Sequence, residues 1–131
     1  MIVVDSNVIA YLYLPGEYAA AAEALLEEDP DWASPVLWRS EFRNILAGYL
    51  RRGTLTFDQA LDIQSEAEDL LGGAEYESDS RDVLALVRDS VCSACDCEFV
   101  ALAKALGTKL VTVDGGILSA FPDSAVALAV D

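Results

Sequence analysis

Two short apolar runs in the sequence each end in an aspartate. Near the N-terminus IVV is followed by Asp5, and later LVTV is followed by Asp114. Each run is predicted to be a strand of a parallel sheet, and functional sites in such sheets lie beyond the carboxyl ends of the strands. Both carboxylates are therefore predicted at one edge of the sheet. The alternative is that each aspartate only caps the turn or helix that follows it.

Two further acids lie in predicted helices with apolar faces. Asp96 is three residues before Phe99 in the helix expected over 94–107, so it shares the apolar face of that helix. Glu41 flanks the apolar stripe of the helix expected over 37–51, where taken alone it is an ordinary solvent-facing glutamate. Four acids gathered at one end of a sheet would raise each other's pKa, and a divalent cation would remove that cost. Because the chain contains no histidine, the ion expected is oxygen-seeking Mg²⁺ or Mn²⁺.

Alternating strand and helix patterns must position these acids. Short apolar strands separated by helices are typical of a parallel sheet covered on both faces. We therefore predict an α/β fold, a single three-layer α/β/α domain over residues 1–131 with a central parallel sheet. Strands are expected at 2–5, 32–35, 74–77, 108–114 and 125–130, and helices at 17–29, 37–51, 56–73, 79–91 and 94–107, with a loop or short helix over 6–18.

The charge of the chain is strongly unbalanced. Asp and Glu number 23 against 8 Lys and Arg, giving a formal net charge of −15. Such a surface repels RNA and DNA unless salt screens the charge or the acidity includes a metal site. Half of the positive charge lies on or just after the helix that carries Glu41. Arg39 and Arg43 in this group are candidate RNA contacts, with surface solubility or pairing with nearby acids as the alternative.

The same charge predicts how salt changes stability. We expect the melting temperature to rise with KCl well beyond about 0.5 M, because screening relieves the self-repulsion of the folded chain. Thermal unfolding in a KCl series measures this. A melting temperature that stays flat or falls with salt would contradict adaptation to a salty cytoplasm.

The cysteines and the N-terminus both indicate a cytoplasmic protein. Cys92, Cys95 and Cys97 are odd in number and crowded together, and no histidine is available to complete a zinc site. We interpret them as reduced thiols. The sequence shows neither a signal-peptide pattern nor an apolar run long enough to span a membrane.

Four segments carry a resemblance to a known family. VVDSNV, SPVLWRSEFRNIL, CDCEFVALAKALG and LVTVDGGI resemble, in this order and over essentially the whole chain, the PIN-domain nucleases, and most closely their VapC-type toxin branch. The resemblance implies a PIN-like fold and catalytic acids at Asp5, Glu41, Asp96 and Asp114. Of these, Asp5, Asp96 and Asp114 would hold Mg²⁺ or Mn²⁺.

The resemblance also implies supporting residues. Asn7 would orient Asp5 or a water on the metal, and Thr112 would support Asp114. The family often has a further acid after the last motif, where this chain has GGIL. Glu98 is the candidate substitute for that acid.

By the same resemblance the chain is a metal-dependent endoribonuclease. It would hydrolyse RNA phosphodiesters as the toxin of a toxin–antitoxin pair, with an antitoxin protein blocking the site and a homodimer as the assembly. The alternative is a PIN-like scaffold that binds RNA or a protein partner without cleaving it. The missing fifth acid and the net charge leave that alternative open.

Overall fold

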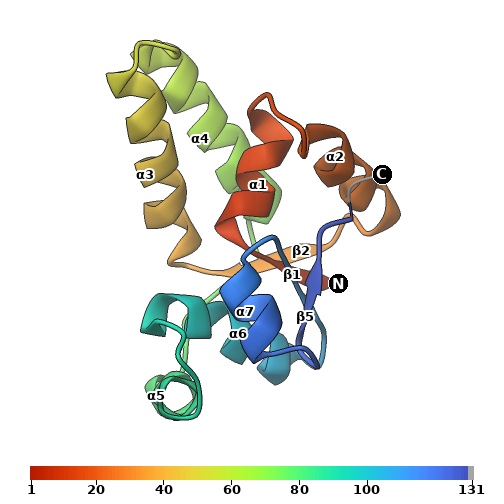
Figure 1. The fold of residues 1–131 in the computed structure, drawn as a ribbon. Helices are drawn as coiled ribbons and strands as arrows, with labels where there is room; N and C mark the ends of the chain where they lie inside the picture. The colour runs from red at the N-terminus through yellow and green to blue at the C-terminus, as the bar shows by residue number, and fades with distance from the viewer. Residues whose placement is uncertain (130–131) are drawn as a thin grey trace.

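A five-stranded parallel sheet forms the centre of the computed structural model, which describes residues 1–129 (Figure 1). The strand order is β3-β2-β1-β4-β5, and all four strand pairs are parallel. The α/β class and the central parallel sheet are confirmed. The strands are β1 (Ile2–Val4), β2 (Trp32–Pro35), β3 (Glu75–Tyr76), β4 (Leu110–Thr112) and β5 (Ala125–Ala127).

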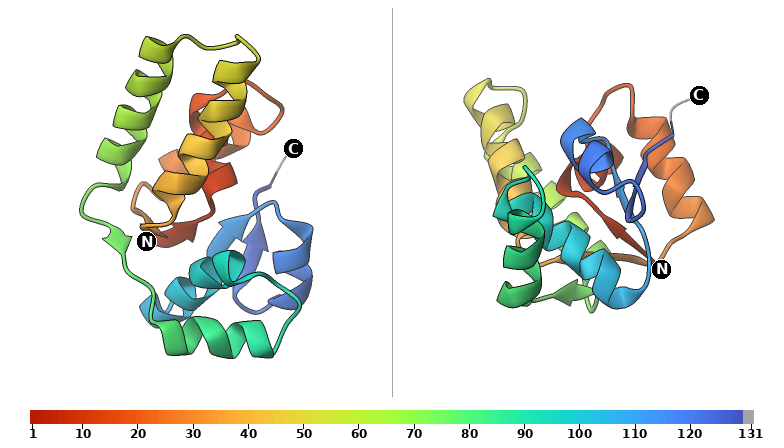
Figure 2. Two further views of the ribbon diagram at one scale, coloured as in Figure 1. Left: turned by 90° about the vertical axis from the view of Figure 1, so that its left-hand side faces the viewer. Right: turned by 60° about the horizontal axis from the view of Figure 1, so that its bottom comes forward.

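Helices cover the sheet on both faces, with α1, α3 and α4 on one side and α5 and α6 on the other (Figures 1 and 2). None of the helices in the described part of the chain combines the length and apolar character that a membrane span requires. The helices are α1 (Ser6–Tyr13), α2 (Ala19–Glu28), α3 (Trp38–Arg51), α4 (Phe57–Leu71), α5 (Ser80–Arg88), α6 (Ala94–Leu106) and α7 (Gly115–Ala120).

The middle strand β1 pairs with β2 on one side and β4 on the other, and this pairing positions the residues at the carboxyl ends of the strands. Val3 lies opposite Ala33 of β2 and Leu110 of β4, and all three side chains are fully buried. Side chains buried on both faces are what a parallel sheet between two helical layers requires. Because β1 and β4 are neighbours and run parallel, the residues that follow them emerge side by side.

Helix ends follow the sequence signals. Thr56 accepts a hydrogen bond from the Gln59 amide in a capping box at the start of α4. Gly107 ends α6 in the left-handed region at φ 67°, where a side chain would be strained. Ser93 caps α6 by accepting from the Asp96 amide at 3.1 Å, which sets Asp96 in the first turn.

The segment predicted as a loop or short helix over 6–18 contains the short helix α1, whose N-cap is Asp5. Two features at the C-terminal end differ from the prediction. Helix α7 was not predicted, since Gly115 and Gly116 disfavour a helix, but Asp114 starts it by accepting from the Ile117 amide at 3.0 Å. The last strand ends at Ala127 rather than at 130, and residue 130 lies outside the described residues.

Candidate active site

The four predicted carboxylates meet in one hollow of about 290 Å³ at the carboxyl edge of the sheet. Asp5 and Asp114 follow β1 and β4, Glu41 comes from the first turn of α3, and Asp96 comes from the first turn of α6. Chain segments more than 100 residues apart are thus brought together. The remaining lining residues are Ser6, Asn7, Asn44 and Ile45.

Asp5 is the most buried acid of the four, with 9% of its surface exposed. One carboxylate oxygen accepts from the Ser6 amide at 2.8 Å, and the other accepts from the Thr112 hydroxyl at 2.7 Å. Burial raises the pKa of Asp5, and these hydrogen bonds oppose the rise, while the charges of Asp96 and Asp114 add to it. The carboxylate is therefore fixed in position but costly to keep ionised.

Thr112 ties the two strand ends together. Its fully buried hydroxyl donates to Asp5 and accepts from the Asp114 amide at 3.0 Å. The sequence assigned Thr112 to Asp114 alone. Because β1 and β4 are adjacent, one threonine reaches both acids.

Glu41 and Asp96 face the strand ends from the two helical layers. Glu41 Oε1 accepts from the Ser6 hydroxyl at 2.7 Å. Burial raises the pKa of Glu41, and the charges of Asp5, Asp96 and Glu98 raise it further. Burial and the charge of Asp114 raise the pKa of Asp96 in the same way. For Asp5, Glu41 and Asp96, burial is the largest cause of the raised pKa, and repulsion from neighbouring carboxylates adds to it.

The donor set fits a hard divalent cation. The side-chain oxygen of Asn7 is buried and has no hydrogen-bond partner among the described residues, and Asn7 lines the hollow. None of the residues that line the hollow is basic. Within residues 1–129, no three Asp, Glu or Cys side chains are arranged as a ready-made metal cage. Mg²⁺ typically retains several of its waters and takes a few carboxylates, so an open set of oxygens suits it.

Ser6 and Asn44 are site residues that the sequence interpretation missed. Ser6 carries no motif of its own, and its partner Glu41 is 35 residues away, so only the fold reveals the pair. Asn44 follows Glu41 by three residues on α3 and lines the same hollow. That helical spacing was the signal that could have identified Asn44.

Two predicted positions need correction. Glu98 does not line the carboxylate hollow; it accepts from the Ser78 hydroxyl at 2.9 Å and lines a separate hollow between α5 and α6. Glu98 follows Cys97 on α6, and at this position of the helix its side chain faces α5 rather than the edge of the sheet. Arg39 is held by Glu75 at 2.7 Å and Glu68 at 2.8 Å, so the nearby acids satisfy its guanidinium. Arg43 is exposed on α3.

Asn7 and the cysteines complete the comparison with the sequence. No hydrogen bond joins Asn7 to Asp5 in the part of the chain described, which leaves a role toward a water or ion. Cys92, Cys95 and Cys97 are free thiols.

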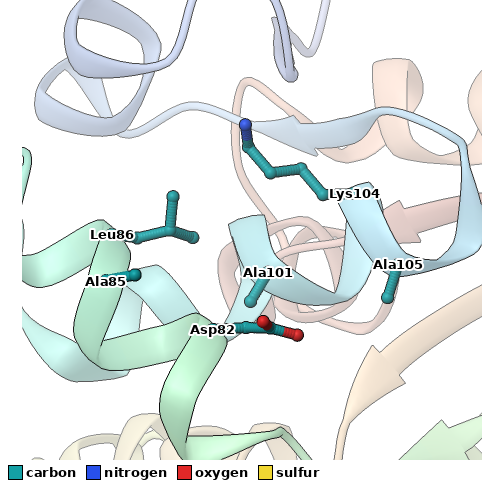
Figure 3. A pocket seen from close by; sticks show the side chains of 6 residues that line it. All are labelled: Asp82, Ala85, Leu86, Ala101, Lys104 and Ala105. Carbon is teal, nitrogen blue, oxygen red and sulfur yellow. The ribbon is translucent and has the colours of Figure 1, made fainter.

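A further hollow of about 370 Å³ lies between α5 and α6 (Figure 3). None of the predicted site residues lines it. Its lining residues are Asp82, Ala85, Leu86, Ala101, Lys104 and Ala105.

The sequence over residues 2–121 matches the family described as PIN domain, and the chain belongs to that family. Ribonuclease VapC3 of Pyrobaculum aerophilum is 31% identical over 124 residues, which cover 92% of this chain and 95% of that protein. The resemblance to the VapC-type branch is confirmed by this relative.

Solved structures share the fold at low identity. PAE2754 from Pyrobaculum aerophilum superposes with a TM-score of 0.77 and 19% identity, covering 97% of this chain and 90% of that one. A toxin–antitoxin complex from Klebsiella pneumoniae contains a chain with a TM-score of 0.73 and 14% identity, covering all of both chains. These two structures support the PIN-like architecture.

Proposed function

We propose that this chain is a divalent-metal-dependent endoribonuclease and the toxin of a toxin–antitoxin pair. The observation that carries the proposal is the convergence of Asp5, Glu41, Asp96 and Asp114 in one oxygen-lined hollow. Membership of the PIN-domain family and the likeness to Ribonuclease VapC3 support the reaction class.

In this proposal Asp5, Asp96 and Asp114 hold Mg²⁺ or Mn²⁺, with the Asn7 oxygen toward the ion or one of its waters. When bound, the ion supplies positive charge at the scissile phosphate and at the leaving oxygen. Thr112 and the Ser6 amide keep Asp5 in one orientation.

Glu41 is the proposed base for the attacking water. Its Oε1 is held by the Ser6 hydroxyl, which leaves Oε2 to position the water and accept its proton. The raised pKa of Glu41 makes it a stronger base than an exposed glutamate. No side chain needs to act as a covalent nucleophile, since the water attacks the phosphorus directly.

The proposed partners follow from the charge of the same hollow. A toxin–antitoxin complex is among the structures that share the fold. Because the hollow has no basic lining residue, an antitoxin arginine could bind two carboxylate oxygens there in place of an ion. We also propose a homodimer that acts on RNA in the cytoplasm.

Manganese binding tests the proposal at Asp5. The Asp5→Asn variant keeps the shape and can still cap α1, but it loses the charge, so we expect its calorimetric Mn²⁺ binding to weaken by more than about 10-fold. Asp79→Asn is the matched control, because Asp79 caps α5 outside the hollow. The control should bind Mn²⁺ like the parent.

The competing function is a scaffold without cleavage. Gly115 and Gly116 stand where the family often has its further acid, and this favours the scaffold. A parent protein that binds no Mn²⁺ in this titration would favour the scaffold and overturn the nuclease.

A further inference from the structure

A second hollow, of about 380 Å³, adjoins the carboxylates. It lies among α1, the connection from α1 to α2, and α3. Asn7 and Ile45 line both hollows, so the two lie next to each other. Its size falls within the range of about 300–1,000 Å³ that is usual for sites of small organic ligands. The other lining residues are Ala10, Tyr11, Leu14, Pro15, Gly16, Glu17, Tyr18 and Tyr49.

Three tyrosines give this hollow flat aromatic walls. The rings of Tyr11 and Tyr18 stack with centroids 4.7 Å apart and an angle of 22° between their planes. The guanidinium of Arg52 lies 4.7 Å from the centroid of the Tyr49 ring. All three tyrosines are partly exposed, although each packs against the core. Partly exposed rings that line a hollow are suited to contact with a planar aromatic group.

The charges of the chain favour contacts to bases over contacts to phosphates. Arg39 is held by two glutamates, Arg88 is paired with Asp89, and Lys109 donates to a backbone carbonyl. These are three of the eight Lys and Arg residues, and the net charge of −15 opposes attraction of an RNA backbone to the rest of the surface. Stacking of a base on an aromatic ring does not depend on charge in this way.

We propose that the hollow lined by Tyr11, Tyr18 and Tyr49, here called the tyrosine hollow, receives an unstacked nucleobase of single-stranded RNA. The inference rests on the proposed function, because it places the base beside the phosphodiester that the carboxylates would cleave. Single-stranded RNA can turn its bases outward onto tyrosine rings, whereas bases in a duplex are already stacked. The hollow therefore gives this nuclease a preference for unpaired RNA.

The test is the affinity for four fluorescent RNA hexamers, rA₆, rC₆, rG₆ and rU₆. Fluorescence anisotropy is measured in EDTA, to prevent metal-dependent cleavage, and in about 1 M KCl, to screen the repulsion. Tyr18→Leu removes a ring but keeps apolar bulk, and we expect it to weaken the tightest complex by roughly 5- to 150-fold. Tyr18→Phe should stay within about 2-fold of the parent, since the ring remains.

Tyr13→Leu is the matched control for the loss of a partly buried tyrosine. Tyr13 lies on α1 but packs edge-on against Phe42 and bonds to the Glu66 carbonyl, away from the hollow. It should bind RNA like the parent. Equal affinity of Tyr18→Leu and parent for the hexamers would overturn the proposal. A parent that binds none of the four hexamers would overturn it as well.

Manganese calorimetry separates this inference from the proposed function. Tyr18 lines the tyrosine hollow but not the carboxylate hollow. Unchanged Mn²⁺ binding in Tyr18→Leu, together with weakened RNA binding, supports the nucleobase site. Intact Mn²⁺ binding with RNA affinity that ignores the tyrosine overturns only the nucleobase site.

Discussion

Replacing Asp96 with asparagine is expected to lower RNA cleavage by more than about 100-fold while raising the melting temperature of the metal-free protein. Loss of an outer-shell partner of a metal site costs about 10- to 100-fold, and a direct ligand should cost more. The melting temperature should rise by about 1–4 °C, because the variant removes a charge that burial and Asp114 already disfavour. Cleavage assays with Mn²⁺ and thermal unfolding in EDTA measure the two effects.

Asp82→Asn is the matched control for this variant. Asp82 occupies the same position in the first turn of α5 that Asp96 occupies in α6, three residues after the capping residue. Both variants lose the favourable contact of an acid with a helix N-terminus, but only Asp96 faces the carboxylate hollow. The control should retain cleavage and gain no stability. Equal cleavage by Asp96→Asn and parent at saturating Mn²⁺ would contradict the assignment of Asp96 as a ligand.

The stability of the metal-free protein is expected to fall as pH rises above about 4. Asp5, Glu41 and Asp96 have pKa values raised above 3.8, 4.5 and 3.8, so the folded state binds more protons than the unfolded state above those values. Their stabilising contribution is complete below the ordinary values and is lost as pH rises through the raised pKa values. Glu75 contributes the opposite pH dependence: Arg39 lowers the pKa of Glu75, so its stabilising contribution is lost as pH falls.

Manganese should reverse this pH dependence. The ion binds the deprotonated carboxylates, so its stabilising effect grows as pH rises. Melting temperatures from about pH 5 to pH 7.5, with Mn²⁺ and with EDTA, give the comparison. The slope in EDTA should be smaller for Asp96→Asn than for Asp82→Asn, because Asp96→Asn removes a group of the carboxylate hollow whose pKa is raised. Identical slopes in the two variants would show that general surface charge, not this hollow, sets the dependence.

Most of the fold could be predicted because its signals are local. The apolar run before Asp5, the Thr56 cap and the terminating Gly107 each lie within a few residues of the boundary they define. Helix α7 was missed because its glycines argue against a helix, and the cap that outweighs them lies at a residue already interpreted as a ligand. The capping role of Asp114 was given only as the alternative to a ligand role, and the structure shows the cap.

The site was predicted in its acids but not in its hydrogen bonds. Asp5, Asp114 and Asp96 could be placed because strand ends and an apolar helix face restrict where they point, whereas Glu41 was assigned through the family resemblance. The bond from Ser6 to Glu41 and that from Thr112 to Asp5 span 35 and 107 residues. Such pairs depend on the relative placement of helices and strands, which periodicity does not define. Glu98 was assigned to the site, and the acids that pair with Arg39 were not named, for the same reason, since the partners of these two residues lie 20 to 36 residues away.

The helix caps determine which acids would be retained in a relative that had lost the proposed nuclease activity. Asp5 starts α1 and Asp114 starts α7, so selection for folding alone retains both. Asp96 does not cap a helix, because Ser93 caps α6. Without an ion, the negative charge of Asp96 lowers the stability of the fold, since burial and Asp114 disfavour its ionised form. Among relatives, an acid at the position of Asp96 should therefore indicate retained catalytic activity. Acids at the positions of Asp5 and Asp114 should be present in inactive relatives as well, because folding requires them.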